Sequence, residues 1–322
     1  MDSKRFHALV EQFSQKHILV VGDLMLDSYM WGATSRISPE APVPIVSVSE
    51  VTHNPGGAAN VGWNIVSLSA KVTMAGIVGD DNHGEQLLEL MTERGMQVHS
   101  VVKDTQRPTT VKTRVIAQGQ QVVRTDQESL EELSGESLHA VKDSIEKCLK
   151  DVDGIILADY NKGLLTEKMI ASILSLSNAN NVPVYVDPKH DHFFAFSGVR
   201  LFKPNSAEFA RAMNSIDPQS GGKALRKKLH AKHVLVTLGA DGMLLTTAKN
   251  SVRINTKTRA VHDVSGAGDT VIAVYTLADQ CGASPEEAAT LANLAAGRVC
   301  EEVGVVPIDL EMLTEMLNHH RT

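Results

Sequence analysis

Residues 263–270 read Asp-Val-Ser-Gly-Ala-Gly-Asp-Thr and lead into an apolar stretch that predicts a helix over residues 271–281. Two glycines around a small residue let the backbone approach a ligand closely, and the free amides of a helix start attract negative charge. A carboxylate at Asp269 would repel a bound phosphate, but it suits a base that removes a proton from a hydroxyl attacking phosphorus. The run therefore predicts a phosphoryl-transfer centre. The alternative is a glycine-rich turn in which Asp269 only favours the helix start.

The composition of the chain is that of a globular enzyme. Its 322 residues are 43% hydrophobic and 21% charged, which excludes a disordered or fibrous chain. The net charge of -7, from 31 basic and 38 acidic residues, argues against nucleic-acid binding, which needs clustered Lys and Arg. The three cysteines form no Cys-x-x-Cys pair, so neither disulfides nor a zinc site are indicated. The sequence shows no signal-peptide pattern and no membrane-spanning stretch, and we expect a cytoplasmic protein with no membrane partner.

Short β-branched runs alternate with helical patterns along most of the chain. Strands are predicted at 18–21, 72–78, 154–158, 184–186 and 234–237, and helices at 58–70, 85–94, 167–178, 206–213, 222–230, 271–281 and 285–302. Elements that alternate in this way imply crossover connections and a mostly parallel sheet covered by helices on both faces. The predicted fold class is therefore α/β, and the ligands of such sheets bind at the carboxyl ends of the strands.

Two regions depart from this alternation. Residues 42–51 predict an extended strand, and residues 109–126 predict two strands, at 111–117 and 121–125. These strands either pair into a small separate sheet or remain a pair of surface hairpins. Because no repeat, long linker or low-complexity tract interrupts the sequence, we expect a single domain over all 322 residues with the small sheet attached.

A second glycine-rich run, Pro-Gly-Gly-Ala-Ala-Asn at residues 55–60, precedes the first long predicted helix. Together with residues 263–270, it resembles the signatures of the ribokinase-like, or phosphofructokinase B (pfkB), family of carbohydrate kinases. The resemblance implies ATP and Mg2+ as cofactors and a small β lid over the sugar site, here about residues 34–52 and 109–126. It assigns the role of catalytic base to Asp269, and it assigns an anion hole to the amides of Gly266, Ala267 and Gly268.

The residues that the resemblance assigns to the sugar lie in two places. Gly56 and Gly57 would let the sugar lie against the backbone and Asn60 would bind a hydroxyl, although such a run alone is also typical of a plain turn. Asp23 and Asp27 follow the first predicted strand, and Asp27 matches the aspartate that the family uses for sugar hydroxyls. Carboxylate oxygens suit this task because they accept hydrogen bonds from hydroxyl groups. The alternative, that a carboxylate only closes the strand exit, applies to Asp23 before Asp27.

The nucleotide site is implied by several short elements. Residues Asn205-Ser206-Ala207-Glu208 match the family's Asn-x-x-Glu element, which implies contacts with nucleotide phosphates and, at Glu208, Mg2+ held through water. The same spacing is typical of a helix capping box that needs no ligand, and both roles are compatible. Residues 237–242 are typical of a hairpin turn. Asp263 and Ser265 correspond to positions that bind a monovalent cation such as K+ in many relatives. The resemblance places the nucleotide against Thr237, Gly239, Gly242 and Asn293.

The long stretch at residues 34–44, Thr-Ser-Arg-Ile-Ser-Pro-Glu-Ala-Pro-Val-Pro, narrows the resemblance to bacterial kinases of D-glycero-β-D-manno-heptose 7-phosphate. That resemblance implies phosphorylation of the anomeric hydroxyl to the 1,7-bisphosphate, on the route to the ADP-heptose of lipopolysaccharide. The alternative is a family member that acts on another sugar or sugar phosphate. Because a phosphorylated substrate needs basic residues in an acidic protein, the candidates for its phosphate are Lys189, Arg114 and Arg124. Each is also compatible with an ordinary surface residue.

The resemblance also bears on partners and on rival classes of protein. Relatives often form dimers through the β lid, so we expect a homodimer with no nucleic-acid partner. Some bifunctional relatives carry an adenylyltransferase with a His-x-Gly-His motif, which this sequence lacks, so we expect either a stand-alone kinase or a kinase half. A nicotinamide-dependent oxidoreductase is disfavoured because no Gly-x-Gly-x-x-Gly follows the first predicted strand. A non-catalytic sugar sensor on the same scaffold is disfavoured by the presence of Asp269.

Overall fold

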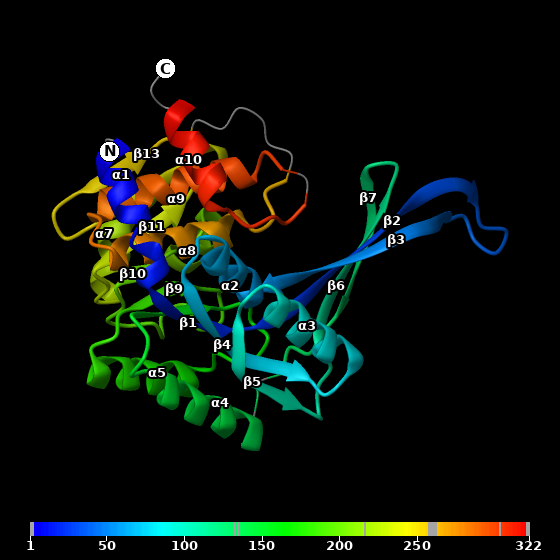
Figure 1. Cartoon of the computed structure of the whole chain (residues 1–322), viewed down its shortest axis with the longest axis horizontal. Helices are drawn as coiled ribbons and strands as arrows, with labels where there is room; N and C mark the ends of the chain where they lie inside the picture. Colours follow the sequence, from blue (N-terminus) through cyan, green and yellow to red (C-terminus); the bar gives the residue numbers. More distant parts are fainter. Residues whose placement is uncertain are drawn as a thin grey trace.

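The computed structural model describes most of the chain (Figure 1). The described residues are 3–131, 133, 135–215, 217–256, 263–302 and 304–319. Within them, helices and strands alternate and form one large sheet and one small sheet, which confirms the α/β class. No helix in these ranges is long and apolar enough to cross a membrane.

The large sheet has nine strands, with β1 (His17–Gly22) lying between β4 (Lys71–Gly79) and β8 (Gly154–Ala158). The other strands are β5 (Gln97–Asp104), β9 (Val184–Asp187), β10 (Leu201–Phe202), β11 (His233–Thr237), β12 (Met243–Thr246) and β13 (Ser251–Ile254). Their order is β13-β12-β11-β10-β9-β8-β1-β4-β5, and every neighbouring pair from β11 to β5 is parallel. Only β12 pairs antiparallel, with β11 and β13. The prediction of a mostly parallel sheet is confirmed.

Helices cover both faces of this sheet, and β1 shows why its strands are apolar throughout. Ile18 and Val20 pack into one buried cluster, whereas Leu19 and Val21 pack into a second cluster on the opposite face. The first face carries α1 (Ser3–Val10), α2 (Ala58–Ser67), α3 (Asn82–Glu93), α8 (Ala267–Gln280), α9 (Pro285–Val299) and α10 (Leu310–His319). The second face carries α4 (Gly135–Cys148), α5 (Glu167–Asn180), α6 (Ser206–Met213) and α7 (Pro218–Lys228).

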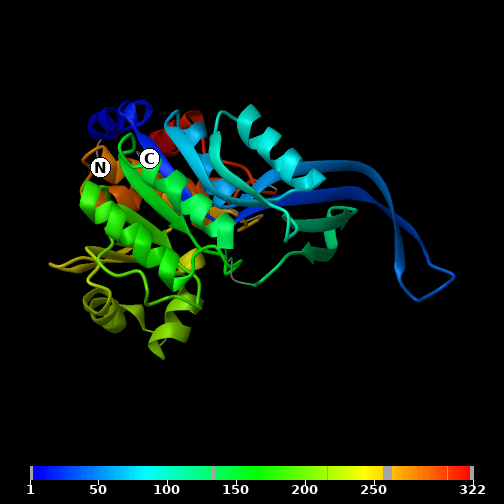
Figure 2. The ribbon, with the colours of Figure 1, turned by 90° about the horizontal axis from the view of Figure 1, so that it is seen from below.

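The small sheet projects from the body of the molecule as an arm, which Figure 2 shows from below. Its four strands are β2 (Leu24–Ile37), β3 (Pro44–Gly57), β6 (Thr110–Ala117) and β7 (Gln120–Gln127). Two antiparallel hairpins, β2 with β3 and β6 with β7, are joined by the parallel pairing of β2 with β6. The prediction of a separate small sheet is therefore confirmed, although the sheet begins at Leu24, well before the expected residue 34.

Helix α8 begins earlier than the apolar pattern indicates. Ala267, Gly268 and Asp269 lie in its first turn, whereas the sequence predicted a start at residue 271. Gly266 is the N-cap residue and has a φ of 80°, a left-handed conformation that glycine adopts without steric cost. Because this turn consists of one alanine, one glycine and one aspartate, it carries no large apolar side chain by which hydrophobic periodicity could detect it.

Candidate active site

The carboxyl ends of the central parallel strands meet at one edge of the large sheet. Gly22 at the end of β1 pairs with Ala158 at the end of β8, and Ala158 pairs in turn with Asp187 at the end of β9. The loops that follow these strands carry polar side chains, and the first turn of α8 reaches the same edge, where Asp269 contacts Tyr160. Open α/β sheets bind their ligands at this edge.

Asp269 is held by hydrogen bonds to both of its carboxylate oxygens. Asn60, in the first turn of α2, donates from Nδ2 to Oδ2 at 2.7 Å, and the Tyr160 hydroxyl donates to Oδ1 at 2.5 Å. Burial raises the pKa of Asp269 to about 6, the hydrogen bond from Tyr160 opposes this rise, and the nearby carboxylate of Asp187 adds to it. A carboxylate with such a pKa is still ionised at neutral pH and is a better base than an ordinary aspartate.

Side chains approach both glycines at the start of α8, and at Gly266 the approach leaves no room for a Cβ. A Cβ added at Gly266 would lie 2.9 Å from Asn60 Nδ2, and one added at Gly268 would lie 3.4 Å from Lys203 Nζ. The α8 turn is tied to α2 by Thr270, whose hydroxyl donates to Asn64 Oδ1 at 2.9 Å. Of the amides at this helix start, that of Ala267 donates to the carbonyl of Val264 at 3.3 Å. The helix start lies between an asparagine and a lysine, which suits an anion cradle.

A buried ion pair lies beside this cradle. Lys203, which follows β10 and is 2% exposed, contacts Asp187 with 3.0 Å between Nζ and Oδ1. Burial raises the pKa of Asp187, and the ammonium of Lys203 opposes the rise. A lysine at the cradle can balance the charge of a phosphoryl group. Sequence analysis missed Lys203, Asp187 and Tyr160 as site residues. Asp187 and Tyr160 come just after the predicted strands 184–186 and 154–158, which was a signal for them, whereas Lys203 follows β10, which was not predicted.

Lys189 lies near the same carboxylates, but its ammonium is engaged. Its Nζ contacts Glu208 Oε1 at 2.5 Å and lies 5.7 Å from the centre of the Tyr160 ring. The charges of Asp187, Glu208 and Asp269 act on it together. The structure thus places Lys189 with the Asn-x-x-Glu element and the base, and not with the basic residues of the small sheet.

The residues predicted to bind the sugar converge where the small sheet joins the body. Asp27, in β2, accepts a hydrogen bond from Arg114 Nη1 at 2.6 Å, and a Cβ added at Gly56 would lie 2.6 Å from Asp27 Oδ2. Gly57 has a φ of 56° and leads directly into α2. Asn60 completes the group. Its Oδ1 is buried and has no hydrogen-bond partner among the described residues, so it is available to a ligand hydroxyl.

Asp23 is buried, and its carboxylate is used by the main chain. Its Oδ2 accepts from the amides of Tyr160 at 2.9 Å and Lys162 at 3.1 Å. Burial raises the pKa of Asp23, whereas these amide bonds lower it. The contacts favour the alternative in which Asp23 closes the strand exit, and they show that it fixes the loop that carries Tyr160.

The Asn-x-x-Glu element forms the capping box that its spacing predicts. Asn205 Oδ1 accepts from the amide of Glu208 at 2.8 Å, and Glu208 Oε2 accepts from the amide of Asn205 at 2.8 Å. Ser206 and Ala207 lie exposed in the first turn of α6. Since Glu208 uses its second oxygen for Lys189, a metal ion would meet this carboxylate through water, as the resemblance implies. Across the described part of the chain, no three His, Cys, Asp or Glu side chains are grouped to hold a metal directly.

The other predicted nucleotide residues fall at the adjacent end of the sheet. Thr237 forms an isolated parallel bridge with Asn205. Gly239 and Gly242 lie in the loop between the antiparallel strands β11 and β12, so the hairpin turn is present. A Cβ added at Gly242 would lie 2.0 Å from the carbonyl oxygen of Ile254, and Asn293 donates to the carbonyl of Asn255 at 3.1 Å. The structure therefore places Gly242 and Asn293 at the end of β13, and Thr237 beside the Asn-x-x-Glu element.

Three further predicted residues, Asp263, Ser265 and Arg124, make only local contacts among the described residues. Asp263 Oδ1 accepts from the amide of Ser265 at 2.8 Å, which closes a tight turn just before α8. Arg124 has a half-exposed side chain and donates to Asp126 on its own strand at 2.9 Å. Its contacts favour the surface alternative, in contrast to those of Arg114.

Solved structures define the class of fold to which this geometry belongs. The chain is similar to phosphofructokinase-2 from Escherichia coli, with a TM-score of 0.79 and 18% identity over 95% of this chain and 99% of that chain. A ribokinase from Arabidopsis thaliana, solved with ribose and ATP, gives a TM-score of 0.69 and 19% identity, with coverages of 94% and 98%. These similarities show the ribokinase-like fold.

Residues 15–311 match the pfkB family of carbohydrate kinases. The chain belongs to this family and is a carbohydrate kinase. Two curated relatives are named bifunctional protein HldE. The one from Sulfurimonas denitrificans is 40% identical over 303 residues, 92% of this chain and 63% of that protein. The one from Helicobacter pylori is 40% identical over 308 residues, 94% of this chain and 66% of that protein. The chain thus spans 63% to 66% of the length of these relatives.

Proposed function

We propose that the protein uses ATP to phosphorylate the anomeric hydroxyl of D-glycero-β-D-manno-heptose 7-phosphate, giving the 1,7-bisphosphate for ADP-heptose synthesis in the cytoplasm. The proposal is supported by the family, by 40% identity to bifunctional HldE proteins, and by the resemblance of residues 34–44 to heptose phosphate kinases. The single observation that carries the chemistry is the carboxylate of Asp269, fixed between Asn60 and Tyr160 at an amide cradle.

Phosphoryl transfer follows from this arrangement. Asp269 accepts the proton of the anomeric hydroxyl as its oxygen attacks the γ-phosphorus, the new O–P bond forms, and the bond to the leaving ADP oxygen breaks. The amides of Gly266, Ala267 and Gly268 stabilise the charge that the transferring group carries. Lys203 borders the same position and adds a fixed positive charge in a buried setting.

The nucleotide and the cations are assigned to the late strands. The adenosine moiety would lie against Thr237, Gly239, Gly242 and Asn293, and Mg2+ would be held through water by the Asn205–Glu208 element. When bound, Mg2+ neutralises phosphate charge and orients the γ-phosphate. A monovalent cation such as K+ would lie at the Asp263–Ser265 turn, whose carboxylate and backbone oxygens are suitable ligands.

Arg114 is the best candidate for the phosphate that the substrate already carries. It contacts Asp27, a predicted sugar ligand, through one nitrogen, and a guanidinium has further N–H donors to offer a phosphate. Its guanidinium carbon also lies 5.2 Å from the centre of the Tyr29 ring, which holds the side chain in place. One residue would thus link the sugar site to the recognition of the distal phosphate.

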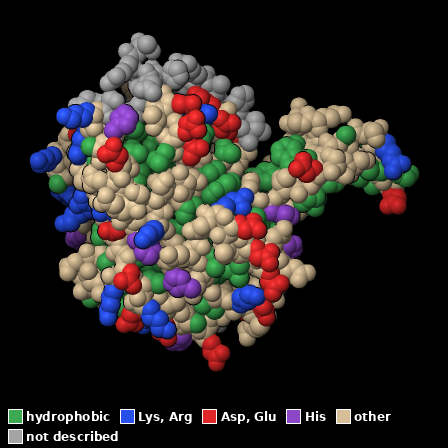
Figure 3. Space-filling view, viewed as in Figure 1, with side chains coloured by type: hydrophobic (Ala, Val, Ile, Leu, Met, Phe, Trp, Pro, Cys, Tyr) green, Lys and Arg blue, Asp and Glu red, His purple; other side chains and the backbone are tan. Residues whose placement is uncertain are grey.

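The small sheet would cover the substrate and mediate a homodimer. Figure 3 shows it standing clear of the body, so much of its surface is open to a partner. Its strands and hairpin loop expose Ile37, Val43, Val48, Val51, Val122 and Val123 at 44% to 61%. Exposed apolar side chains of this density are typical of an interaction surface.

A panel of acceptors tests the proposed substrate. ADP release is measured with ATP, Mg2+ and either D-glycero-β-D-manno-heptose 7-phosphate, fructose 6-phosphate, ribose or unphosphorylated heptose. We expect the heptose 7-phosphate to give the highest kcat/KM. A higher value for fructose 6-phosphate or ribose would instead assign the protein to another substrate within the family, which is the alternative function.

A further inference from the structure

The Tyr160 hydroxyl donates a hydrogen bond to Asp269 that the sequence motifs do not account for. It donates to Oδ1 at 2.5 Å, while Asn60 donates to Oδ2 at 2.7 Å from the opposite element, α2. Two donors on the two oxygens prevent rotation of the carboxyl group. Each oxygen still keeps a second acceptor site, so the carboxylate can receive the proton of a substrate hydroxyl.

We propose that Tyr160 is a positioning residue for the catalytic base, which orients the Asp269 carboxylate and keeps it deprotonated in the working enzyme. The proposal rests on the proposed function, in which Asp269 acts as the base. Tyr160 itself touches the base and is assigned no contact with the substrate.

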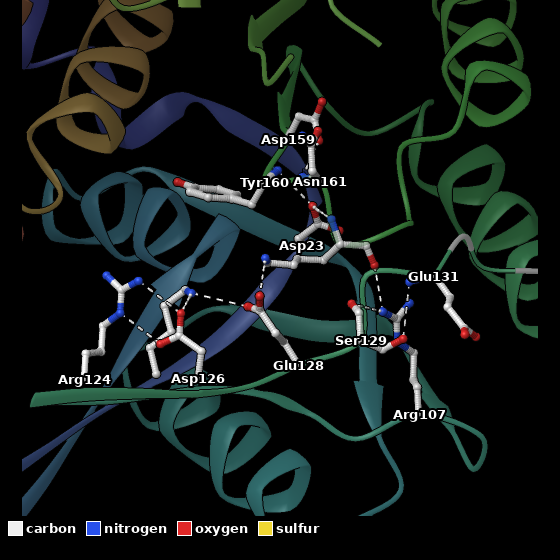
Figure 4. A network of polar contacts seen from close by, with 12 residues as sticks. Asp23, Arg107, Arg124, Asp126, Glu128, Ser129, Glu131, Asp159, Tyr160 and Asn161 are labelled. Atoms are coloured by element: carbon white, nitrogen blue, oxygen red, sulfur yellow. Dashed lines mark hydrogen bonds and ion pairs between the residues drawn. The ribbon is translucent and has the colours of Figure 1, made fainter. Parts of the chain in front are cut away.

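The loop that carries Tyr160 is fixed on both sides of the contact. Asp23 accepts from the amides of Tyr160 at 2.9 Å and Lys162 at 3.1 Å. Lys162 is also held through its carbonyl oxygen by Arg107 at 2.7 Å and through its ammonium by Glu128 at 2.9 Å. Figure 4 shows Asp23 beneath this loop and the Tyr160 side chain extending away from the ion pairs. Since residue 162 is bound at three points, the tyrosine is placed before any substrate arrives.

The holding residues come from the small sheet as well as from the large one. Arg107 precedes β6, and Glu128 directly follows β7, where it also contacts Lys112 at 3.4 Å. The loop therefore connects the base of the small sheet to the catalytic carboxylate.

The groups that face Asp269 act in opposite directions on its charge. Burial and the Asp187 carboxylate disfavour the ionised form, whereas Tyr160, Asn60 and Lys203 favour it. Lys189 also interacts with this carboxylate. Burial and the charge of Asp269 raise the pKa of Tyr160, so the hydroxyl stays protonated and can act only as the donor towards a carboxylate. Removing this donor should shift the balance towards the protonated, inactive base.

Tyr160→Phe tests the proposal through the pH dependence of kcat/KM, measured by ADP release with heptose 7-phosphate. We expect its acid limb to move to higher pH by about one unit, since one hydrogen bond to a charged group is lost. At pH 6 this shift alone lowers kcat/KM by about fivefold, and the deficit from ionisation disappears above pH 8. An acid limb at the wild-type pH, with or without a uniform loss of rate, would overturn the proposal.

Tyr185→Phe is the matched control. Tyr185 is another buried tyrosine whose hydroxyl donates to a carboxylate, Asp279 Oδ2, at 2.5 Å, but it lies in β9 near the amino end of the sheet. Its replacement should leave the acid limb unchanged. If the limb moves equally in both variants, the effect is structural and the proposal fails.

The titration of Asp269 can also be followed without turnover, by carboxyl 13C NMR of protein labelled at aspartate, with the signal assigned through its absence in Asp269→Asn. We expect Tyr160→Phe to raise this pKa, and an unchanged pKa contradicts the proposal. This readout tests the role of Tyr160 separately from the proposed function, because it does not depend on whether heptose 7-phosphate is the substrate. If Tyr160→Phe does not fold, Lys162→Met loosens the same loop, and its acid limb should also rise; an unchanged limb would count against the proposal.

Discussion

Replacing Asp269 with asparagine should abolish activity and, at the same time, stabilise the protein. Burial and the neighbouring Asp187 carboxylate raise the pKa of Asp269 to about 6 from its ordinary 3.8. In the unfolded chain the group titrates normally, so folding at neutral pH places a negative charge where the protein disfavours it. A neutral amide of nearly the same shape avoids this cost.

The size and sign of the effect follow from proton linkage. A difference of about two pKa units corresponds to about 2–3 kcal/mol of folding free energy. The folded state holds its proton up to about pH 6, so the penalty is fully present above that pH, shrinks as the pH falls, and vanishes below about 3.8. For 322 residues, with an unfolding entropy of about 2.1 cal/mol/K per residue, removal of this penalty in Asp269→Asn should raise Tm by about 3–4 °C.

The hydrogen bonds around residue 269 can survive the change. Tyr160 can donate to the remaining amide oxygen, as it does to Oδ1 of the carboxylate. Asn60 can turn its own amide over, so that its unpartnered Oδ1 accepts from the new NH2 group. The turned Asn60 NH2 group then occupies the place of the unpartnered oxygen, and this unpaired donor offsets part of the gain in stability.

The assay is urea unfolding at pH 8 and pH 5, combined with ADP release. We expect turnover to fall by about 100-fold to 10,000-fold, the range that a general base contributes. The stability gain at pH 8 should drop to about half at pH 5. Asp279→Asn is the control, because Asp279 is held by Arg200 at 2.8 and 2.9 Å and its loss should destabilise. Turnover within about tenfold of wild type, or a less stable Asp269→Asn at pH 8, would refute the reasoning.

Three further changes test separate parts of the structure. Gly266→Ala should lower activity by about 100-fold or more, because the φ of Gly266 is 80° and the new Cβ would press on the Asn60 amide. The control is Gly282→Ala, where φ is 79° and the surroundings are open, so only backbone strain should reduce the folding stability, by about 1 kcal/mol. Burial lowers the pKa of His233 to about 4 from 6.5, so stability should fall by about 2 kcal/mol between pH 7.5 and pH 5, and His233→Gln should flatten this slope in urea unfolding. Arg114→Met should raise KM for the phosphorylated sugar by about 10-fold to 100-fold and leave KM for ATP unchanged; an equal loss with unphosphorylated heptose would contradict its role.

The features that could be predicted from the sequence are those that depend on local physics. Four consecutive apolar residues, 18–21, indicate a strand buried on both faces, and the structure packs them alternately into two cores. Gly266 marks a left-handed turn that glycine adopts without strain, and both glycine runs lead into helices, as the sequence indicated. Each of these signals comes from a single short segment of the chain.

The features that were missed depend on contacts between distant segments. Tyr160 lies 109 residues from Asp269 in the chain and meets it because α8, which carries Asp269, packs against β8, which Tyr160 follows. Lys203 and Asp187 become a pair because β10 lies beside β9. Helix α4 was missed for another reason: only Val141, Ile145 and Cys148 in it are buried, so its apolar stripe is too sparse to recognise. Strand order is not encoded in any single window of sequence.

The central claim is that a carboxylate in an amide cradle directs ATP to the anomeric oxygen of a heptose phosphate. 31P NMR of a reaction with ATP, Mg2+ and D-glycero-β-D-manno-heptose 7-phosphate tests it most directly. We expect a new phosphate signal coupled to the anomeric proton, formed in step with ADP by the wild-type protein and absent with Asp269→Asn. Inorganic phosphate as the only new signal, or a product phosphorylated equally by the asparagine variant, would contradict the claim.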